Sequence, residues 1–94
     1  MIQSFRGAAA ERTFRQQPTK KFRLIEKTAL RKLIQLNQAR SLRDLGRIPG
    51  NKLEALKGDR KGQHSIRIND QYRVCFAWKD GDAYDLEITD SIYE

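Results

Sequence analysis

The sequence is poor in cysteine, histidine and long apolar runs. It has one cysteine and one histidine in 94 residues, so we predict no internal disulfide, no metal site and no cofactor. The lone Cys75 suits a reducing cytoplasm, where we interpret it as a small packing residue. No segment approaches the ~18 apolar residues of a membrane span, and none of the ~7–15 apolar residues of a signal peptide precedes Glu11. We therefore expect a soluble, cytoplasmic protein without a membrane partner.

Basic residues are in excess and unevenly placed. The 19 Lys and Arg residues against 12 Asp and Glu give a net charge of +7. The surplus lies within residues 1–73, whereas residues 74–94 hold one basic residue, Lys79, and six acidic ones. Such clustering is typical of nucleic-acid-binding proteins, although small basic proteins also carry solvated charge without a ligand.

Hydrophobic periodicity predicts helices in the first half of the chain. Residues 2–5 suit a short strand, and a short helix is expected to open at Gly7 and end before Pro18. From about Lys21 to Gln38 apolar residues recur at intervals of three and four, which predicts an amphipathic helix whose apolar stripe is needed for the core. A further helical turn is predicted at residues 41–45. The length suits one domain, and we assign residues 1–94 to it.

The second half alternates apolar and polar residues, which predicts three strands of an antiparallel meander. A three-residue loop at residues 69–71 places Arg67 opposite Arg73, whereas a two-residue loop would mix the two faces of the sheet. Residues 79–82 form the next hairpin turn, and residues 84–89 form the last strand.

The alternation also assigns two faces to this sheet. We expect helices to cover the face formed by Ile66, Tyr72, Val74, Phe76, Leu86 and Ile88. The other face is expected to stay open and is formed by Ser65, Arg67, Arg73, Cys75 and Glu87. The predicted architecture is an α+β fold, with a short N-terminal strand and two helices packed on one face of a mainly antiparallel sheet.

Arg67 and Arg73 face each other in this register. Like charges opposite each other destabilise a sheet by up to ~1 kcal/mol, so the pair needs a carboxylate neighbour or an anionic partner. Parity leaves the register of the last hairpin open, with either Glu87 or Thr89 opposite Arg73. With Glu87 there, Arg73 is half of a surface salt bridge worth at most ~1 kcal/mol.

Short motifs of one known family are spread over nearly the whole chain. They are Pro49-Gly50-Asn51, Leu53-Glu54, Leu56, Gly58, Gly62-Gln63-His64-Ser65-Ile66-Arg67, Asn69 and Arg73-Val74-Cys75-Phe76, with Ile2-Gln3-Ser4-Phe5 and Leu86-Glu87-Ile88-Thr89-Asp90 at the two ends. In these motifs the chain resembles the HigB-type toxins of bacterial toxin–antitoxin modules, a branch of the RelE/ParE superfamily.

The resemblance implies a function and partners. It implies a RelE/ParE-like toxin domain that acts as a ribosome-dependent endoribonuclease, cutting mRNA in the ribosomal A site and so inhibiting translation and growth. It also implies a HigA-like helix-turn-helix antitoxin, through which alone the toxin would reach operator DNA.

Cleaving RNA by attack of the ribose 2′-OH requires a base for that hydroxyl, cations for the phosphorane charge and an acid for the leaving 5′-oxygen, but no metal. Arg67 and Arg73 match the family's cationic sheet positions and can both donate to one phosphate. The loop residues Lys57, Arg60 and Lys61 are predicted to hold flanking phosphates of RNA, unless they are simply solvated.

His64 is the only histidine, and histidine is the side chain whose ordinary pKa of ~6.5 suits proton transfer at neutral pH. It also matches a histidine implicated in the family's active site. Strand parity places it on the side of Ile66, away from the arginines. Either a bulge after Gln63 turns it toward the phosphate, or it is a strand-end histidine half inside the core.

The C-terminus departs from the family, whose members commonly end in Asp-Tyr-His. Here Asp90 matches the aspartate, the histidine is absent, and the tyrosine is displaced by two residues to Tyr93. The candidate catalytic residues of this metal-independent endoribonuclease are His64, Arg67, Arg73, Asp90 and Tyr93. The altered ending predicts an enzyme weakened relative to the family unless Tyr93 substitutes.

Two rival interpretations stay open. The first is a ParE-like, non-enzymatic inhibitor of DNA gyrase, for which the basic sheet would be an interaction surface. The convergence of His64, Arg67 and Arg73 favours a nuclease, because a gyrase inhibitor does not require it. The second is a plain RNA-binding module, which the few aromatic residues on the exposed face disfavour.

Overall fold

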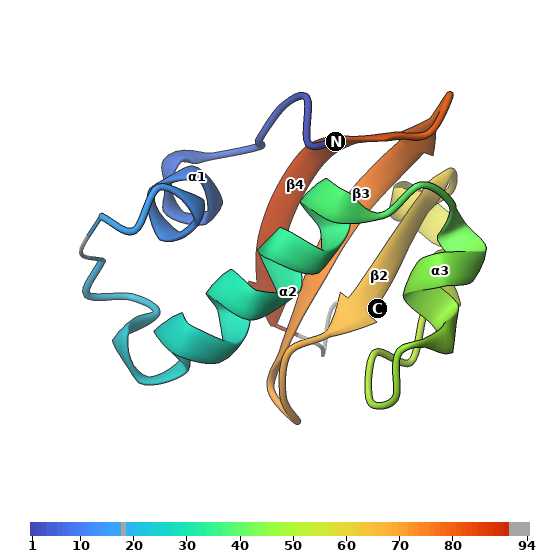
Figure 1. The fold of residues 1–94 in the computed structure, drawn as a ribbon. Helices are drawn as coiled ribbons and strands as arrows, with labels where there is room; N and C mark the ends of the chain where they lie inside the picture. Colours follow the sequence, from blue (N-terminus) through green and yellow to red (C-terminus); the bar gives the residue numbers. More distant parts are fainter. Residues whose placement is uncertain (18, 91–94) are drawn as a thin grey trace.

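A single antiparallel sheet carries all three helices on one of its faces. The structure, a computed structural model, describes residues 1–17 and 19–90. In chain order its elements are α1 (Ala8–Phe14), the 3-10 turn η1 (Arg23–Ile25), α2 (Glu26–Gln38), α3 (Leu42–Arg47), β1 (Glu54–Ala55), the 3-10 turn η2 (Gly58–Arg60), β2 (Gln63–Arg67), β3 (Tyr72–Lys79) and β4 (Asp82–Asp90). The strands lie in the order β1-β2-β3-β4 with antiparallel neighbours (Figure 1). The α+β prediction is confirmed.

The central helix is shorter at its N-terminus than its periodicity predicts. Residues before Glu26 form a turn and η1, in which Thr19 Oγ1 accepts a hydrogen bond from the Phe22 backbone N–H at 3.3 Å. This turn directs Phe22 into the core beside α2. Within α2 the predicted stripe is correct, since Ala29, Leu33 and Leu36 are fully buried. Of the helices described in residues 1–17 and 19–90, none has the length and apolar character needed to cross a bilayer.

The predicted N-terminal strand is reduced to two isolated parallel bridges to β4. Ile2 pairs with Ala83 and Phe5 with Leu86. The ladder is interrupted between them because Asp85 adopts a left-handed conformation (φ 55°). There the hydroxyl of Ser4 accepts the Asp85 backbone N–H at 2.8 Å, so a side chain replaces the backbone partner.

Both predicted hairpins are present. The β2-β3 loop has three residues, and Asn69 Oδ1 accepts the backbone N–H groups of Gln71 and Tyr72 at 2.9 and 2.7 Å. In the β3-β4 hairpin the register left open by the sequence is settled. Thr89, not Glu87, is the partner of Arg73.

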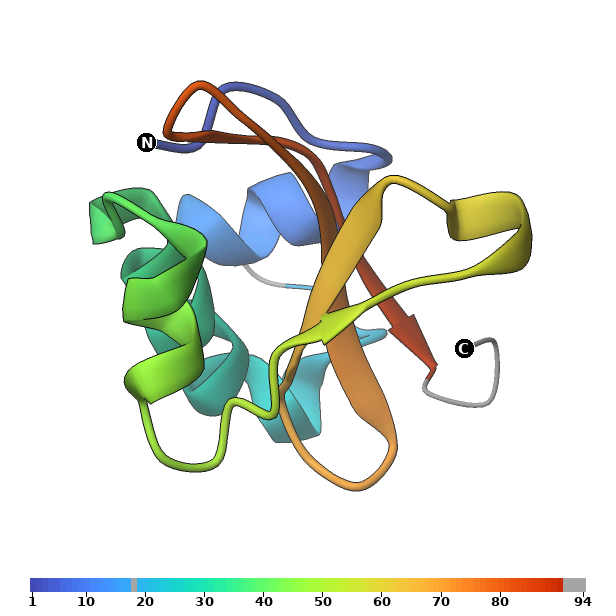
Figure 2. The ribbon, with the colours of Figure 1, turned by 90° about the vertical axis from the view of Figure 1, so that its right-hand side faces the viewer.

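The face opposite the helices is not open, which corrects the prediction. Ser65 and Cys75 are fully buried and Arg73 is only 6% exposed. The reason is the segment containing β1 and η2, which pairs with the edge of β2 and then crosses the outer side of the sheet (Figure 2). From this segment Arg60 reaches Glu87 on β4, with 2.9 Å between Nη2 and Oε1.

Candidate functional site

Arg67 and Arg73 lie directly opposite each other on β2 and β3, as the sequence predicts. Each arginine has a carboxylate neighbour. Arg67 forms an ion pair with Asp70 in the adjoining loop, and Arg73 Nη2 lies 4.0 Å from Glu54 Oε2 on β1. The like charges are therefore offset within the protein, which is one of the two outcomes predicted for this pair.

The two guanidinium groups differ in how firmly they are held. Arg73 donates from Nε to Ser65 Oγ at 2.8 Å and from Nη2 to the Lys52 carbonyl at 2.6 Å. Its placement as an outward-leaning side chain was wrong, because the β1 segment lies over it. Arg67 has a side chain that is 31% exposed, and its partner Asp70 is 98% exposed. An external anion can therefore replace Asp70 at Arg67 at little cost, since exposed ion pairs contribute at most ~1 kcal/mol.

His64 lies on the other face of the sheet, and no bulge in β2 turns it around. It is the partner of Phe76, and the two rings stack with their centroids 6.1 Å apart. Its Nδ1 atom is buried and has no hydrogen-bond partner among the described residues. The structure therefore does not bring His64 together with Arg67 and Arg73, and its position matches the alternative of a histidine half inside the core.

The predicted basic loop divides into two parts. Lys57 and Lys61 are exposed. Arg60 is half-buried, because it is bound to Glu87 and donates from Nη1 to Gln63 Oε1 at 3.0 Å. Arg60 is therefore not an exposed loop residue like Lys57 and Lys61, and the predicted RNA contacts of the three residues stay a prediction.

A cavity of about 420 Å³ lies at the C-terminal end of β4. It is lined by Lys21, Phe22, Arg60, Tyr72, Glu87, Ile88, Thr89 and Asp90. It brings the predicted residues Arg60 and Asp90 together, and it adjoins Arg73 because Thr89 both lines the cavity and is the cross-strand partner of Arg73. The last candidate, Tyr93, lies outside the described residues.

Tyr72 and Lys21 are among the lining residues of this cavity that the sequence did not place in a site. Tyr72 is the cross-strand partner of Asp90, and the hairpin register would have revealed it once Thr89 was placed opposite Arg73. Tyr72 packs edge-on against Phe22, with 5.4 Å between ring centroids. Lys21 lies in the turn before α2, and no sequence pattern indicated that it lines a cavity.

A buried polar cluster around Asn51 supports the site from the helix side. Lys32 on α2 donates to Asn51 Oδ1 at 2.5 Å. Asn51 Nδ2 donates to Gln35 Oε1 and to the Leu45 carbonyl, both at 3.1 Å. The Asn51 carbonyl in turn accepts the Arg67 backbone N–H at 2.7 Å. Asn51 therefore joins α2 and α3 to the strand that carries Arg67.

Burial gives Lys32 an unusual protonation equilibrium. Desolvation lowers the pKa of Lys32 below its ordinary 10.5, and the positive charges of Arg31 and Arg67 lower it further.

Among the described residues no group of three or more His, Cys, Asp or Glu side chains is placed to hold a metal ion.

Comparison with known proteins identifies a family and a relative that this chain resembles. The profile of a family described as the RelE-like toxin of type II toxin-antitoxin system HigB matches residues 3–90. Toxin HigB-1 of Vibrio cholerae is 49% identical over 57 residues, which cover 61% of this chain and 60% of that protein. The match thus spans about 60% of the relative's length.

A solved structure, the YoeB-YefM complex from Staphylococcus aureus, is similar with a TM-score of 0.54 and 20% identity, covering 93% of this chain and 95% of that chain. At this identity the likeness supports the fold alone, and it agrees with the helices and antiparallel sheet described above. Because the family profile covers nearly the whole described chain, this protein belongs to the HigB family of RelE-like toxins of type II toxin–antitoxin systems.

Proposed function

We propose that this toxin is a metal-independent endoribonuclease that cleaves mRNA on the ribosome, and that a HigA-like helix-turn-helix antitoxin neutralises it. Membership of a toxin–antitoxin family implies an antitoxin partner. The observation that carries the nuclease proposal is the Arg67–Arg73 pair. It sets two guanidinium groups on neighbouring strands, and Thr89, the cross-strand partner of Arg73, lines a cavity that Asp90 also lines.

The arginines would stabilise the negative charge that builds up on the phosphorane. Arg73 is already fixed by Ser65 and the Lys52 carbonyl, so little reorganisation accompanies the reaction. A positive charge fixed in advance in this way can stabilise a transition state without further reorganisation. Arg67 would exchange its exposed partner Asp70 for the scissile phosphate. Lys57 and Lys61, both exposed, would hold phosphates on either side without sequence preference.

The proton transfers are assigned to the end of the chain. In the proposed reaction the 2′-oxygen forms a bond to phosphorus while the bond from phosphorus to the 5′-oxygen breaks. Asp90 would accept the proton of the 2′-OH, and the hydroxyl of Tyr93 would donate one to the leaving 5′-oxygen. His64 could act only if β2 changed its register, so we propose that it mainly packs against Phe76.

The test is cleavage of a defined mRNA on programmed ribosomes by the purified toxin, with the product ends identified. Attack by the 2′-OH predicts a 2′,3′-cyclic phosphate and a 5′-hydroxyl. Arg67→Ala is expected to slow cleavage ~10²-fold, the scale of one lost preorganised donor. Arg43→Ala, which removes an exposed arginine from α3, is the matched control and should cleave normally.

Two results would overturn the proposal. One is products with 3′-hydroxyl ends, which would exclude attack by the neighbouring 2′-OH. The other is intact mRNA together with inhibition of DNA gyrase, which would identify the protein as a ParE-like, non-enzymatic gyrase inhibitor.

A further inference from the structure

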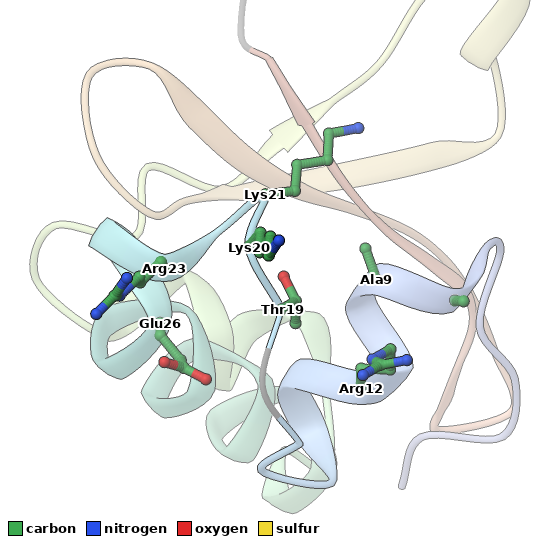
Figure 3. Close-up of a pocket in the computed structure, with 8 residues that line it drawn as sticks. Ala9, Arg12, Thr19, Lys20, Lys21, Arg23 and Glu26 are labelled. Atoms are coloured by element: carbon green, nitrogen blue, oxygen red, sulfur yellow. The ribbon is translucent and has the colours of Figure 1, made fainter.

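A second and larger cavity lies beside α1. It measures about 720 Å³ and is lined by Ala8, Ala9, Arg12, Thr19, Lys20, Lys21, Arg23 and Glu26. Figure 3 shows Arg12 rising from α1 on one side and Arg23 and Glu26 lying on the other, with Thr19, Lys20 and Lys21 between them. We call this cavity the α1 groove. Four of its lining residues are basic and one is acidic.

Three of the four basic residues that line the α1 groove form no ion pair within the described residues. These three, Lys20, Lys21 and Arg23, are exposed. Lys21 Nζ lies instead over the ring of Phe22, 5.4 Å from its centroid. Several cations gathered in one hollow without carboxylate partners favour a bound polyanion, because its phosphates replace a layer of mobile counterions.

The α1 groove adjoins the candidate site at Lys21. Lys21 lines both the α1 groove and the cavity at the end of β4 that contains Asp90. An RNA strand that leaves the cavity at the end of β4 can therefore pass Lys21 and enter the α1 groove. This arrangement favours an RNA strand over a separate protein partner, since an RNA substrate must extend beyond the phosphate that is cut.

The lining of the α1 groove also indicates which part of the RNA is held. It has no aromatic side chain among the described lining residues, so it offers no platform for base stacking. Its arginine and lysine side chains, with the small residues Ala8 and Ala9 beside them, suit binding of phosphate groups, which carry no sequence information.

We propose that the α1 groove binds the phosphate backbone of RNA next to the cleavage site, through Lys20, Lys21 and Arg23 with Arg12 on the opposite wall. This inference rests on the proposed function, because it takes RNA to be the substrate. It adds a second set of RNA contacts, on the helical side of the protein, to the loop of Lys57 and Lys61.

The experiment compares two double variants that each lose two exposed positive charges. Lys20→Gln with Arg23→Gln alters the α1 groove, and Arg43→Gln with Arg47→Gln alters α3 as the matched control. Both pairs are exposed, so circular dichroism and thermal unfolding should match the wild type. Binding is measured by cosedimentation with programmed ribosomes, with ribosomes lacking mRNA, and by titration of a free single-stranded oligonucleotide, each from about 50 to 200 mM salt.

The groove variant is expected to bind RNA roughly tenfold more weakly. The slope of log affinity against log salt should fall by about 1.4, because two contacts with single-stranded RNA are lost at about 0.7 each. Loss only when mRNA is present would assign the contacts to the message and support the proposal. Equal loss on empty ribosomes would assign the contacts to ribosomal RNA and overturn their placement next to the cleavage site.

Unchanged RNA binding by the groove variant would overturn the proposal. If that variant instead lost affinity for the purified antitoxin alone, the α1 groove would be assigned to a protein partner. The binding assays do not depend on cleavage. A wild-type toxin that binds RNA through the groove but leaves mRNA intact would refute the proposed nuclease activity while the groove assignment stands.

Discussion

Arg67 and Arg73 are cross-strand neighbours held in different ways: Arg67 by the exposed carboxylate of Asp70, and Arg73 by hydrogen bonds to Ser65 Oγ and the Lys52 carbonyl, with Glu54 4.0 Å away. The difference gives each a distinct part in the proposed reaction. Arg73 is a fixed cation whose position is set by the fold. Arg67 can exchange its partner when a phosphate arrives.

We expect Arg73→Ala to reduce both stability and cleavage. From the sequence alone the substitution is expected to leave the fold intact, but the buried position of Arg73 changes that expectation. Ser65 Oγ and the Lys52 carbonyl would lose their donor, which should cost about 2 kcal/mol of unfolding free energy in a urea titration. Cleavage should fall by ~10²-fold or more.

Arg73→Lys separates the two effects. Lysine keeps the charge but not the planar set of donors that reaches both oxygens, so stability should be partly recovered and cleavage should stay low. A folded Arg73→Ala protein that cleaves mRNA and arrests growth at the wild-type level would refute the role of Arg73 as a cation for the phosphate.

Asn51→Ala should be among the most destabilising single substitutions away from the apolar core. The side chain is fully buried and serves Lys32, Gln35 and the Leu45 carbonyl at once. Its loss leaves a buried ammonium group without its acceptor, at a cost of roughly 3 kcal/mol. Asn37→Ala removes only the bond from the Ile2 backbone N–H and should cost about 1 kcal/mol by the same urea titration. Equal effects of the two substitutions would contradict a central role for Asn51.

The buried Lys32 predicts a rise in stability at alkaline pH. Its pKa is lower in the folded protein than the ordinary 10.5 of the unfolded chain. Between those two values the unfolded state binds more protons, so the unfolding free energy increases with pH in that window. Below it, the cost of keeping a charged Lys32 buried is present in full.

Lys32→Met provides the reference for this measurement, because it removes the titrating group and keeps much of the apolar stem. Unfolding free energies of the two proteins are compared from about pH 8 up to 10.5, so that groups common to both cancel. The unfolding free energy of the wild type should rise relative to that of Lys32→Met as the pH increases. A constant difference would mean that the pKa of Lys32 is not lowered by folding.

Local pattern was sufficient to predict β2, β3 and β4 and the register of the β2-β3 hairpin. Burial of Ile66, Val74 and Phe76 admits only one phase of the alternation, which also placed Arg67 opposite Arg73. Alternation fixes which residues share a face, but not what covers that face. The crossing of the β1 segment over Arg73 depends on a non-local contact between Arg60 and Glu87, and neither periodicity nor turn chemistry encodes it.

The candidate site was likewise only partly predictable. The arginines lie on strands whose register the sequence defines, whereas the register of β4, which carries Asp90, was left open by the sequence. Lys21 and Asn51 lie in irregular segments, whose positions depend on tertiary hydrogen bonds such as that from Lys32 to Asn51. For the same reason the α1 groove was not foreseen, because it forms between α1 and the turn that replaces the expected first part of the long helix.

The altered chain ending gives a last prediction, which follows from the sequence because residues 91–94 lie outside the described part. The family commonly ends in Asp-Tyr-His, whereas Asp90 is followed here by Ser91, Ile92 and Tyr93. If Tyr93 serves as the displaced acid, Tyr93→Phe should slow cleavage ~10²-fold, the scale of a well-placed general acid. The substitutions Ser91→Tyr and Ile92→His restore the family ending and should raise the cleavage rate of the Tyr93→Phe protein by a similar factor. Single-turnover cleavage on programmed ribosomes measures both effects, and no response to either change would remove the chain ending from the mechanism and leave proton transfer to Asp90 or to solvent.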